Sequence, residues 1–220
     1  MVNDMIITAI KPQQKGNKRL SLFIDGKFAL GVSSTVLQEA GIHAGLSVSQ
    51  SEVDNLKKAE QGQHALNRAL QHLSYRPRSE YEVKTRLKRY GYEDDIIATT
   101  LDRLRNSGYI DDVAFTTYWK ENRSSFSSRG TRLIVQELKQ KGIDSETIAE
   151  TIADINDEAE AYRAGQKKAH SLSTVEKYEF RRKLGAFLRR RGFDYEVISP
   201  VVSRLWDEQN SEDKKWNQFG

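Results

Sequence analysis

The amino-acid sequence predicts a mainly α-helical protein, in which a small β-rich N-terminal domain precedes three tandem three-helix repeats. Three glycines, Gly91, Gly142 and Gly192, lie 51 and 50 residues apart, and a leucine stands four residues before each of them. Apolar residues recur at helical spacing on both sides of each glycine, which indicates two helices separated by a break. Glycine suits this break because helices commonly end in a left-handed residue, which glycine adopts without steric cost. We expect the repeats to form an elongated, curved array.

Residues 1–60 have the composition of a small β-rich domain. Residues 6–10 and 20–24 are short segments rich in β-branched and other apolar side chains. Residues 27–32 follow an Asp-Gly pair at positions 25–26, which is a strong signal for a two-residue hairpin turn. These segments predict a three-stranded sheet.

Two helices are expected to follow the sheet. Ser33 or Ser34 can cap a short helix that ends at Gly41 and covers one face of the sheet. Ser51 can cap a second, longer helix in the same way. Because Gly62 lies within the helical pattern, we expect a kink or two separate parts at that position.

The first repeat is assigned to residues 61–112. Its first helix carries a stripe of alanine and leucine side chains at helical spacing. Ser79 and Glu82 have the spacing of a capping box, which predicts the start of the second helix. Acidic residues 93–95 are expected at the N-terminus of the third helix, where the helix dipole stabilises negative charge. This helix is expected to stop near Gly108.

The second repeat is assigned to residues 113–157. Its first helix is expected to bury a stripe of four residues: Ala114, Phe115, Tyr118 and Trp119. The serine-rich residues 124–130 predict a flexible polar connection to the second helix. Asp144 or Ser145 can cap the third helix.

The third repeat is assigned to residues 158–206. Its first helix has a weaker apolar stripe, formed by Ala159, Tyr162 and Ala169. We expect its second helix over residues 174–188 and its third helix over residues 195–206. Residues 207–220 are polar and are expected to form a frayed tail.

Composition and motifs argue against an enzyme or a metalloprotein. The chain has no cysteine, which excludes disulfides and thiolate ligands and fits a reducing cytoplasm. It contains no glycine-rich phosphate loop and no serine-hydrolase or zinc-protease motif, and no two of its four histidines lie four residues apart. No apolar run approaches the roughly 20 residues that span a membrane. We therefore expect a cytoplasmic protein without catalytic residues, metal or cofactor.

Basic residues cluster in or beside the second helix of each repeat. The net charge is +4, and residues 158–220 carry 13 Lys and Arg against 10 Asp and Glu. The helix dipole stabilises cations in the last turn of a helix by about 0.3–1 kcal/mol, so part of this enrichment needs no ligand. It does not explain arginines near helix starts, which suit an anionic partner better. We therefore expect a role in binding for eight residues: Arg76, Arg78, Lys84, Arg132, Lys139, Lys141, Arg182 and Arg189.

Three motifs occur in order along the repeats. Residues 75–82 read Tyr-Arg-Pro-Arg-Ser-x-x-Glu, residues 108–115 read Gly-Tyr-Ile-Asp-Asp-x-x-Phe, and residues 137–143 read Glu-Leu-Lys-Gln-Lys-Gly-Ile. Together these motifs resemble the RecX family of bacterial recombination regulators. The resemblance extends over residues 61–205, and residues 6–48 are similar to the additional N-terminal segment of the longer members.

This resemblance implies a non-enzymatic regulator of homologous recombination, DNA repair and the SOS response. Its partner would be the RecA recombinase filament on single-stranded DNA, whose ATP hydrolysis and strand exchange it would inhibit. The resemblance also implies some direct affinity for DNA, with double-stranded DNA as an open alternative to single-stranded DNA. We expect a monomer with no membrane partner.

Two other functions fit the same residues. A helical-repeat module could bind nucleic acid without a recombinase target, because paired short helices also form helix-turn-helix domains. The other alternative is a scaffold of helical repeats without a binding site. An enzyme is the alternative that fits the sequence least. ATP hydrolysis by RecA in the presence of this protein distinguishes the regulator from these alternatives.

Overall fold

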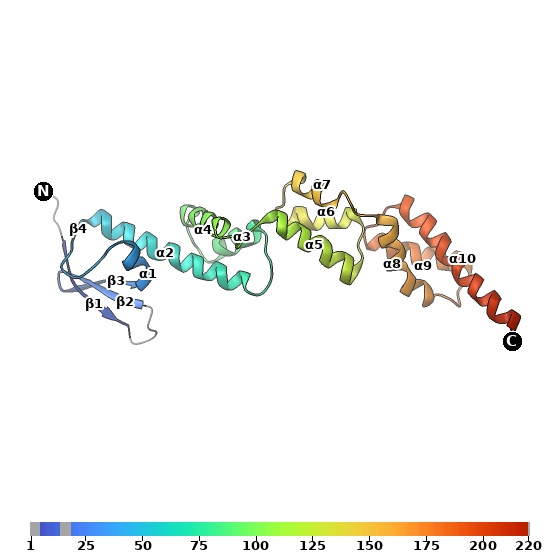
Figure 1. Cartoon of the computed structure of the whole chain (residues 1–220), viewed down its shortest axis with the longest axis horizontal. Helices are drawn as coiled ribbons and strands as arrows, with labels where there is room; N and C mark the ends of the chain where they lie inside the picture. The colour runs from blue at the N-terminus through green and yellow to red at the C-terminus, as the bar shows by residue number, and fades with distance from the viewer. Residues whose placement is uncertain (1–4, 14–18, 220) are drawn as a thin grey trace. The chain divides into compact units, whose positions relative to one another are not determined.

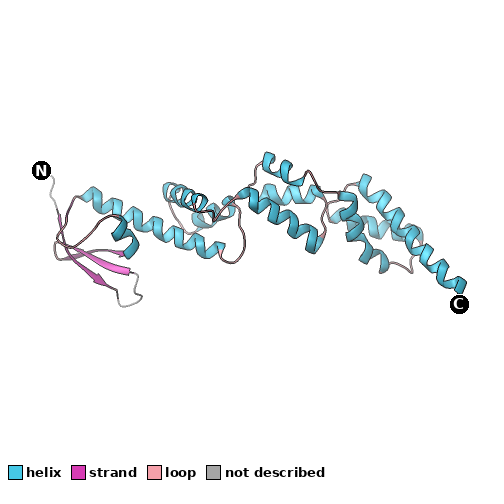
Figure 2. Cartoon of the chain, viewed as in Figure 1, coloured by secondary structure: helices cyan, strands magenta, loops and turns pink. Residues whose placement is uncertain are grey.

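The computed structural model of the chain describes residues 5–13 and 19–219 (Figure 1). It divides into two compact units, of which the first comprises Met1–Arg78 with Glu82–Ile110 and the second comprises Ser79–Tyr81 with Asp111–Gly220. Strands occur in the first unit, whereas the described part of the second unit is built from helices (Figure 2). The mainly helical fold with an N-terminal sheet is therefore confirmed.

The N-terminal sheet has four antiparallel strands in the order β3-β2-β1-β4. The strands are β1 (Met5–Pro12), β2 (Arg19–Ile24), β3 (Lys27–Ser33) and β4 (Ser47–Val48). Asp25 and Gly26 both have positive φ, 48° and 78°, as the predicted two-residue hairpin turn requires. The expectation of three strands was wrong, because the two-residue β4 is too short to produce an alternating pattern in the sequence.

Two helices cover one face of this sheet (Figure 1). Ser33 caps α1 (Ser34–Glu39), and its hydroxyl accepts a hydrogen bond from the N–H of Val36, as predicted. Nine buried side chains form the core between the sheet and the two helices: Ile7, Leu22, Ile24, Val32, Val36, Leu37, Val48, Val53 and Leu56.

Helix α2 (Gln50–Leu73) departs from the sequence prediction in two ways. Its cap is Ser49 rather than Ser51, and Ser49 forms a capping box with Glu52. The helix also runs through Gly62 as one element. Side chains buried on both sides of the glycine outweigh the cost of about 1 kcal/mol that an interior glycine brings.

The first repeat packs the second half of α2 against α3 (Glu80–Arg89) and α4 (Asp94–Asn106). Its predicted helix starts after Ser79 and Glu93 are confirmed. The buried side chains are Ala65, Ala69, Val83, Leu87, Ile96, Ile97, Leu101, Leu104 and Ile110.

The second unit contains two further three-helix groups. The first is α5 (Asp112–Ser127), α6 (Thr131–Gln140) and α7 (Ser145–Ile152), and the second is α8 (Asp157–His170), α9 (Lys177–Arg190) and α10 (Tyr195–Phe219). Residues 124–127 belong to α5 instead of the predicted loop, and α10 extends through the predicted tail to Phe219. The predictions of a loop at the serine-rich residues and of a frayed tail at the polar C-terminal residues were therefore wrong.

The stripes of the first helices also differ from the prediction. In α5 Phe115 is buried, but Ala114 and Tyr118 are exposed. In α8 the buried small residues are Ala161, Gly165 and Ala169, of which only Ala169 was predicted. A Cβ at Gly165 would lie 2.7 Å from Leu205 Cδ1, so the glycine permits the close approach of α8 and α10. The sequence analysis missed this position because it had no reason to place a glycine in a helical core.

The three glycines at the repeat breaks have the left-handed conformation that was predicted. Their φ angles are 82° at Gly91, 77° at Gly142 and 90° at Gly192. The residue after each glycine donates a backbone hydrogen bond to a carbonyl of the preceding helix. For example, the N–H of Phe193 donates to Leu188 O at 3.3 Å. These contacts satisfy carbonyl groups that a helix end otherwise leaves without partners.

Within the second unit, the start of α6 packs against the break at Gly192. The N–H of Gly130 donates to Arg191 O at 2.9 Å, and the N–H of Thr131 donates to Asp157 Oδ1 at 2.9 Å. The first residue of α8 thus caps the first residue of α6. This contact holds the two three-helix groups of the unit together.

A similar contact involves the segment Ser79–Tyr81, which belongs to the second unit. The hydroxyl of Ser79 donates to Lys141 O at 2.7 Å, and the N–H of Glu80 donates to Asp112 Oδ1 at 2.8 Å. Burial raises the pKa of Asp112, while the N–H of Glu80 acts in the opposite direction. In both places the first N–H of a helix donates to an aspartate Oδ1, and the residue before it donates to the carbonyl that precedes a break glycine, through a hydroxyl at Ser79 and a backbone N–H at Gly130.

Candidate functional site: an arginine-lined groove

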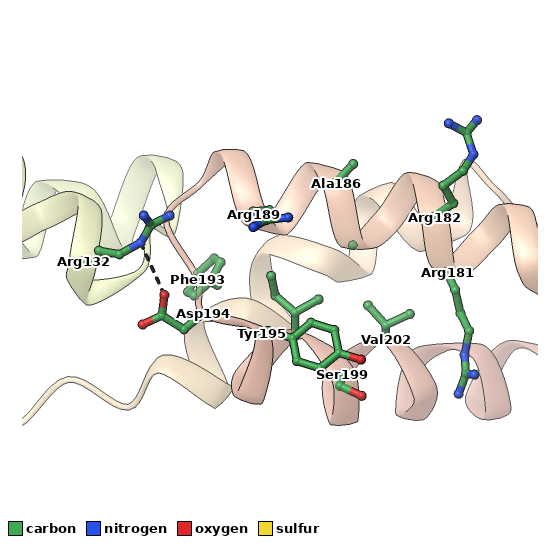
Figure 3. Close-up of a pocket in the computed structure, with 12 residues that line it drawn as sticks. Arg132, Arg181, Arg182, Ala186, Arg189, Phe193, Asp194, Tyr195, Ser199 and Val202 are labelled. Atoms are coloured by element: carbon green, nitrogen blue, oxygen red, sulfur yellow. Dashed lines mark ion pairs between the residues drawn. The ribbon is translucent and has the colours of Figure 1, made fainter.

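The second unit contains a groove of about 720 Å³ between α9 and α10, with the first turn of α6 at one end (Figure 3). Apolar side chains from α10 and the preceding turn form part of its lining, including Phe193, Ile198 and Val202. Basic side chains form the rest: Arg132, Arg181, Arg182 and Arg189. The groove thus combines an apolar lining with four guanidinium groups.

Helix α9 positions three of these arginines. Phe180, Leu184 and Leu188 are fully buried and fix the helix against the core of the third repeat. Arg181 and Arg189 stand eight residues apart, with Gly185 midway between them, so the three lie along one side of the helix. Because Gly185 has no side chain, the groove stays open between the two arginines. Arg181 extends toward α10, whereas Arg182 points away from it (Figure 3).

The charges in the groove are only partly neutralised. Arg132 Nε lies 3.3 Å from Asp194 Oδ1, and Arg181 Nη2 donates to the hydroxyl of Ser203 at 2.9 Å. Asp194 is the one carboxylate among the twelve described residues that line the groove. Arg189 forms no ion pair with a described residue. The lining therefore has a surplus of positive charge, which favours phosphate or carboxylate groups.

Arg182 lies at the edge of the groove with its own partner. It makes two hydrogen bonds of 2.8 Å to Glu179, one turn earlier on α9. Hydrogen bonds from Arg182 and Lys183 lower the pKa of Glu179 to about 2. Arg182 is exposed and Glu179 is about one-third exposed, so solvent screens this ion pair and it adds little to stability. An anionic ligand must compete with Glu179 for Arg182.

Tyr195 adds an aromatic group to the lining. It is the first residue of α10, and its side chain is 79% exposed. An exposed ring beside guanidinium groups can stack on a base while the arginines contact the backbone phosphates, as in proteins that bind single-stranded nucleic acid. The groove is therefore a candidate nucleic-acid interface.

Of the eight predicted binding residues, the structure brings together Arg132, Arg182 and Arg189 in this groove. Lys139 and Lys141 lie on or after the last turn of α6 and do not line it. Lys139 is exposed, whereas Lys141 is half-buried with its Nζ 4.7 Å from the centre of the Trp119 ring.

The other three predicted residues belong to the first unit. Arg76 and Arg78 are partly buried near Glu82, and Lys84 is exposed on α3. Burial, together with the charge of Arg76, lowers the pKa of Arg78. None of the three lines the groove.

Two residues of the groove were missed by the sequence analysis. Arg181 could have been selected, because it lies two helical turns before Arg189 on the same side of a predicted helix. Tyr195 carries no such signal, since its exposure depends on how α9 and α10 pack.

A second, smaller groove lies on the other side of α9. Its volume is about 440 Å³, and its lining includes Arg163, Lys167, Lys168 and Arg191 around Phe187. No carboxylate lines it among the residues that the structure describes. Because these basic side chains come from α8 and from Arg191 just after α9, positive charge lies on both sides of α9.

The described ranges 5–13 and 19–219 contain neither a helix suited to span a membrane nor a cluster of metal ligands. None of the helices there has both the length and the apolar character required to cross a bilayer. Nor do three or more histidine, aspartate or glutamate side chains gather there in a way that could hold a metal ion.

Four family models match the chain in order. They are described as the regulatory protein RecX N-terminal domain, at residues 5–49, and the first, second and third three-helix domains of RecX, at residues 65–104, 111–152 and 156–202. Together they extend over most of the chain, from the sheet to α10.

Curated relatives carry the same description. The protein named Regulatory protein RecX from Lactobacillus gasseri is 33% identical over 214 residues, which cover 96% of this chain and 78% of the relative. A protein of the same name from Bacillus velezensis is 30% identical and covers 94% of this chain and 80% of the relative. These relatives are named as regulatory proteins and not as enzymes.

Solved structures agree in fold. A crystal structure of regulatory protein RecX matches with a TM-score of 0.74 at 24% identity, covering 90% of this chain and 99% of the other. The crystal structure of RecX from Lactobacillus salivarius matches with a TM-score of 0.60 at 23% identity, covering 67% of this chain and 97% of the other.

Proposed function

Because the chain belongs to the RecX family of regulatory proteins, we propose that it regulates the RecA recombinase by binding the RecA filament on single-stranded DNA. Binding would inhibit ATP hydrolysis and strand exchange by the filament. The protein would act in the cytoplasm as a monomer and would contact DNA directly as well as RecA.

The structural observation that supports the DNA contact in this proposal is the arginine-lined groove between α9 and α10. Its four guanidinium groups, Arg132, Arg181, Arg182 and Arg189, are of the type that binds backbone phosphates through opposite charge and paired hydrogen bonds. Exposed Tyr195 and the apolar lining suit the unstacked bases of a single strand.

The filament offers both chemistries that such a groove can bind. It presents DNA phosphates and protein carboxylates close together, and guanidinium groups bind either through paired hydrogen bonds. Contact with both would distinguish the filament from free DNA and from free recombinase. Membership of the RecX family favours a regulator over a module that binds nucleic acid alone.

A binding competition tests the proposal. Fluorescence anisotropy of the labelled protein is measured with bare single-stranded DNA and with the same DNA coated by RecA in the presence of a non-hydrolysable ATP analogue. We expect tighter binding to the coated DNA. Equal or weaker binding to the coated DNA would count against a recombinase target.

Matched variants locate the interface. Arg181→Gln with Arg189→Gln should weaken filament binding about tenfold or more, because each lost charge-assisted hydrogen bond contributes roughly 1.5–3 kcal/mol. Arg89→Gln with Arg103→Gln removes two exposed charges outside the groove and serves as the control. If the two double variants bind the filament equally well, the groove is not the interface.

A further inference from the structure

Four arginines lie in the first unit where α2 leads into α3, two of them beside the carboxylate of Glu82 and two against the ring of Tyr90. Arg76 donates two hydrogen bonds to Glu82, at 2.8 and 3.3 Å. Arg78 lies 3.9 Å from the same carboxylate. Arg68 on α2 and Arg86 on α3 form no ion pair with any residue in the described part of the chain. We call Arg68, Arg76, Arg78 and Arg86 the arginine cluster; Glu82 balances only one of its four charges.

Arg78 is the most enclosed member of the arginine cluster. Its side chain is 18% exposed, and its Nε is buried without a hydrogen-bond partner among the described residues. A buried donor that lacks an acceptor costs roughly 1–3 kcal/mol. An acceptor supplied by a ligand would remove this cost.

Arg68 and Arg86 are held by the same aromatic ring. Each guanidinium carbon lies 4.8 Å from the centre of the Tyr90 ring. Stacking on an aromatic face fixes the guanidinium plane and leaves its N–H groups available for an oxyanion. Neither side chain requires a carboxylate from the protein in order to be positioned.

The pKa of His72 reflects the excess positive charge of the arginine cluster. It lies one turn after Arg68 on α2, and its pKa is lowered by burial and then by the charges of Arg78 and Arg86. Glu82 acts in the opposite direction but does not compensate. The local field is therefore positive even with the carboxylate present.

Structural roles explain only part of the arginine cluster. Arg76 fixes the loop between α2 and α3 through Glu82, and Arg86 lies in the last turn of α3, where the helix dipole stabilises a cation. Neither role accounts for Arg68 or for the buried Nε of Arg78.

We propose that the arginine cluster binds a phosphate group. The phosphate belongs either to a nucleic-acid backbone or to a small phosphorylated molecule, since both present the same oxygen atoms to guanidinium forks. The site lies in the first repeat and uses none of the groove residues. It therefore stands whether or not RecA is the partner of the protein.

Two exposed members of the arginine cluster allow a test in the full-length chain. Arg68→Gln with Arg86→Gln is compared with Arg89→Gln and Arg103→Gln, which remove two exposed charges from α3 and α4 of the same repeat. Thermal unfolding is followed in sodium phosphate and in sodium chloride of equal pH and ionic strength. Anisotropy then measures binding of a labelled oligonucleotide that carries no terminal phosphate.

The two readouts separate the two sources of phosphate. For a nucleic-acid backbone, oligonucleotide affinity falls about tenfold in the Arg68 and Arg86 variant relative to the control. For a small phosphorylated molecule, oligonucleotide affinity is unchanged, but the stabilisation of the protein by inorganic phosphate is lost in this variant alone. If the variant matches the control in both measurements, the proposal is overturned. Because RecA is absent from both assays, the result is independent of the proposed regulation of the recombinase.

Discussion

Gly192 and Gly91 share a left-handed backbone but have different surroundings. Their φ angles are 90° and 82°. A Cβ added at Gly192 would come within 3.0 Å of the backbone nitrogen of Leu133 on α6, whereas a Cβ at Gly91 would meet nothing within 4 Å. Gly192 is therefore required for packing as well as for its backbone conformation.

We predict that Gly91→Ala lowers the free energy of unfolding by about 1 kcal/mol, the cost of a left-handed alanine. Gly192→Ala should cost more, because α6 must move away from the break. Urea unfolding followed by circular dichroism measures both variants. Equal losses for the two would contradict the packing role of Gly192.

Individual residues show what a sequence pattern can and cannot predict. The left-handed glycines were predictable, since a repeated break between apolar stripes requires a helix end. The enclosure of Arg78 was not, because it depends on how the loop between α2 and α3 places Arg76 and Arg78 around Glu82. The exposure of Tyr195 likewise follows from helix packing and not from its neighbours in the chain.

The start of α6 depends on a side chain from α8. Asp157 Oδ1 accepts hydrogen bonds from the N–H of Thr131 at 2.9 Å and from its hydroxyl at 2.8 Å. The residue before α6, Gly130, has no side chain with which to cap the helix. Asp157 thus replaces a local cap and joins two helices of the second unit.

We predict that Asp157→Ala lowers the free energy of unfolding by about 1–2 kcal/mol, because an orphan N–H at the helix start loses its acceptor. Asp157→Asn keeps an acceptor oxygen and should cost clearly less. Amide hydrogen exchange at Thr131, measured by NMR, should accelerate in the alanine variant only. Unchanged exchange in that variant would show that the cap is dispensable.

Elements were easiest to predict where an apolar stripe and a cap coincide, as in α1 and α7. They were harder where polar composition hid a helix, as at the ends of α5 and α10. A serine-rich or charged surface is compatible with a helix once the preceding turns are anchored by buried residues. Strand β4 was missed because its two residues are too few to show the alternation of apolar and polar side chains that marks a strand.

At the scale of the whole molecule, positive charge is distributed over both units. The first unit holds the arginine cluster around Glu82, and the second unit holds the groove between α9 and α10. Net charge alone, at +4, gives no indication of this distribution. The fold class and the repeats could be read from the pattern of glycines and apolar residues, whereas the proposed recombinase partner rests on membership of a family.

ATP hydrolysis by RecA on single-stranded DNA is the most direct measurement of the proposed regulation. The rate is followed while the full-length protein is titrated from below to several times the concentration of RecA, with Arg181→Gln plus Arg189→Gln in parallel. The proposal predicts progressive inhibition by the wild-type protein and a shift of the variant's curve to about tenfold higher concentration. An ATPase rate that stays constant with the wild-type protein in excess would contradict the proposal.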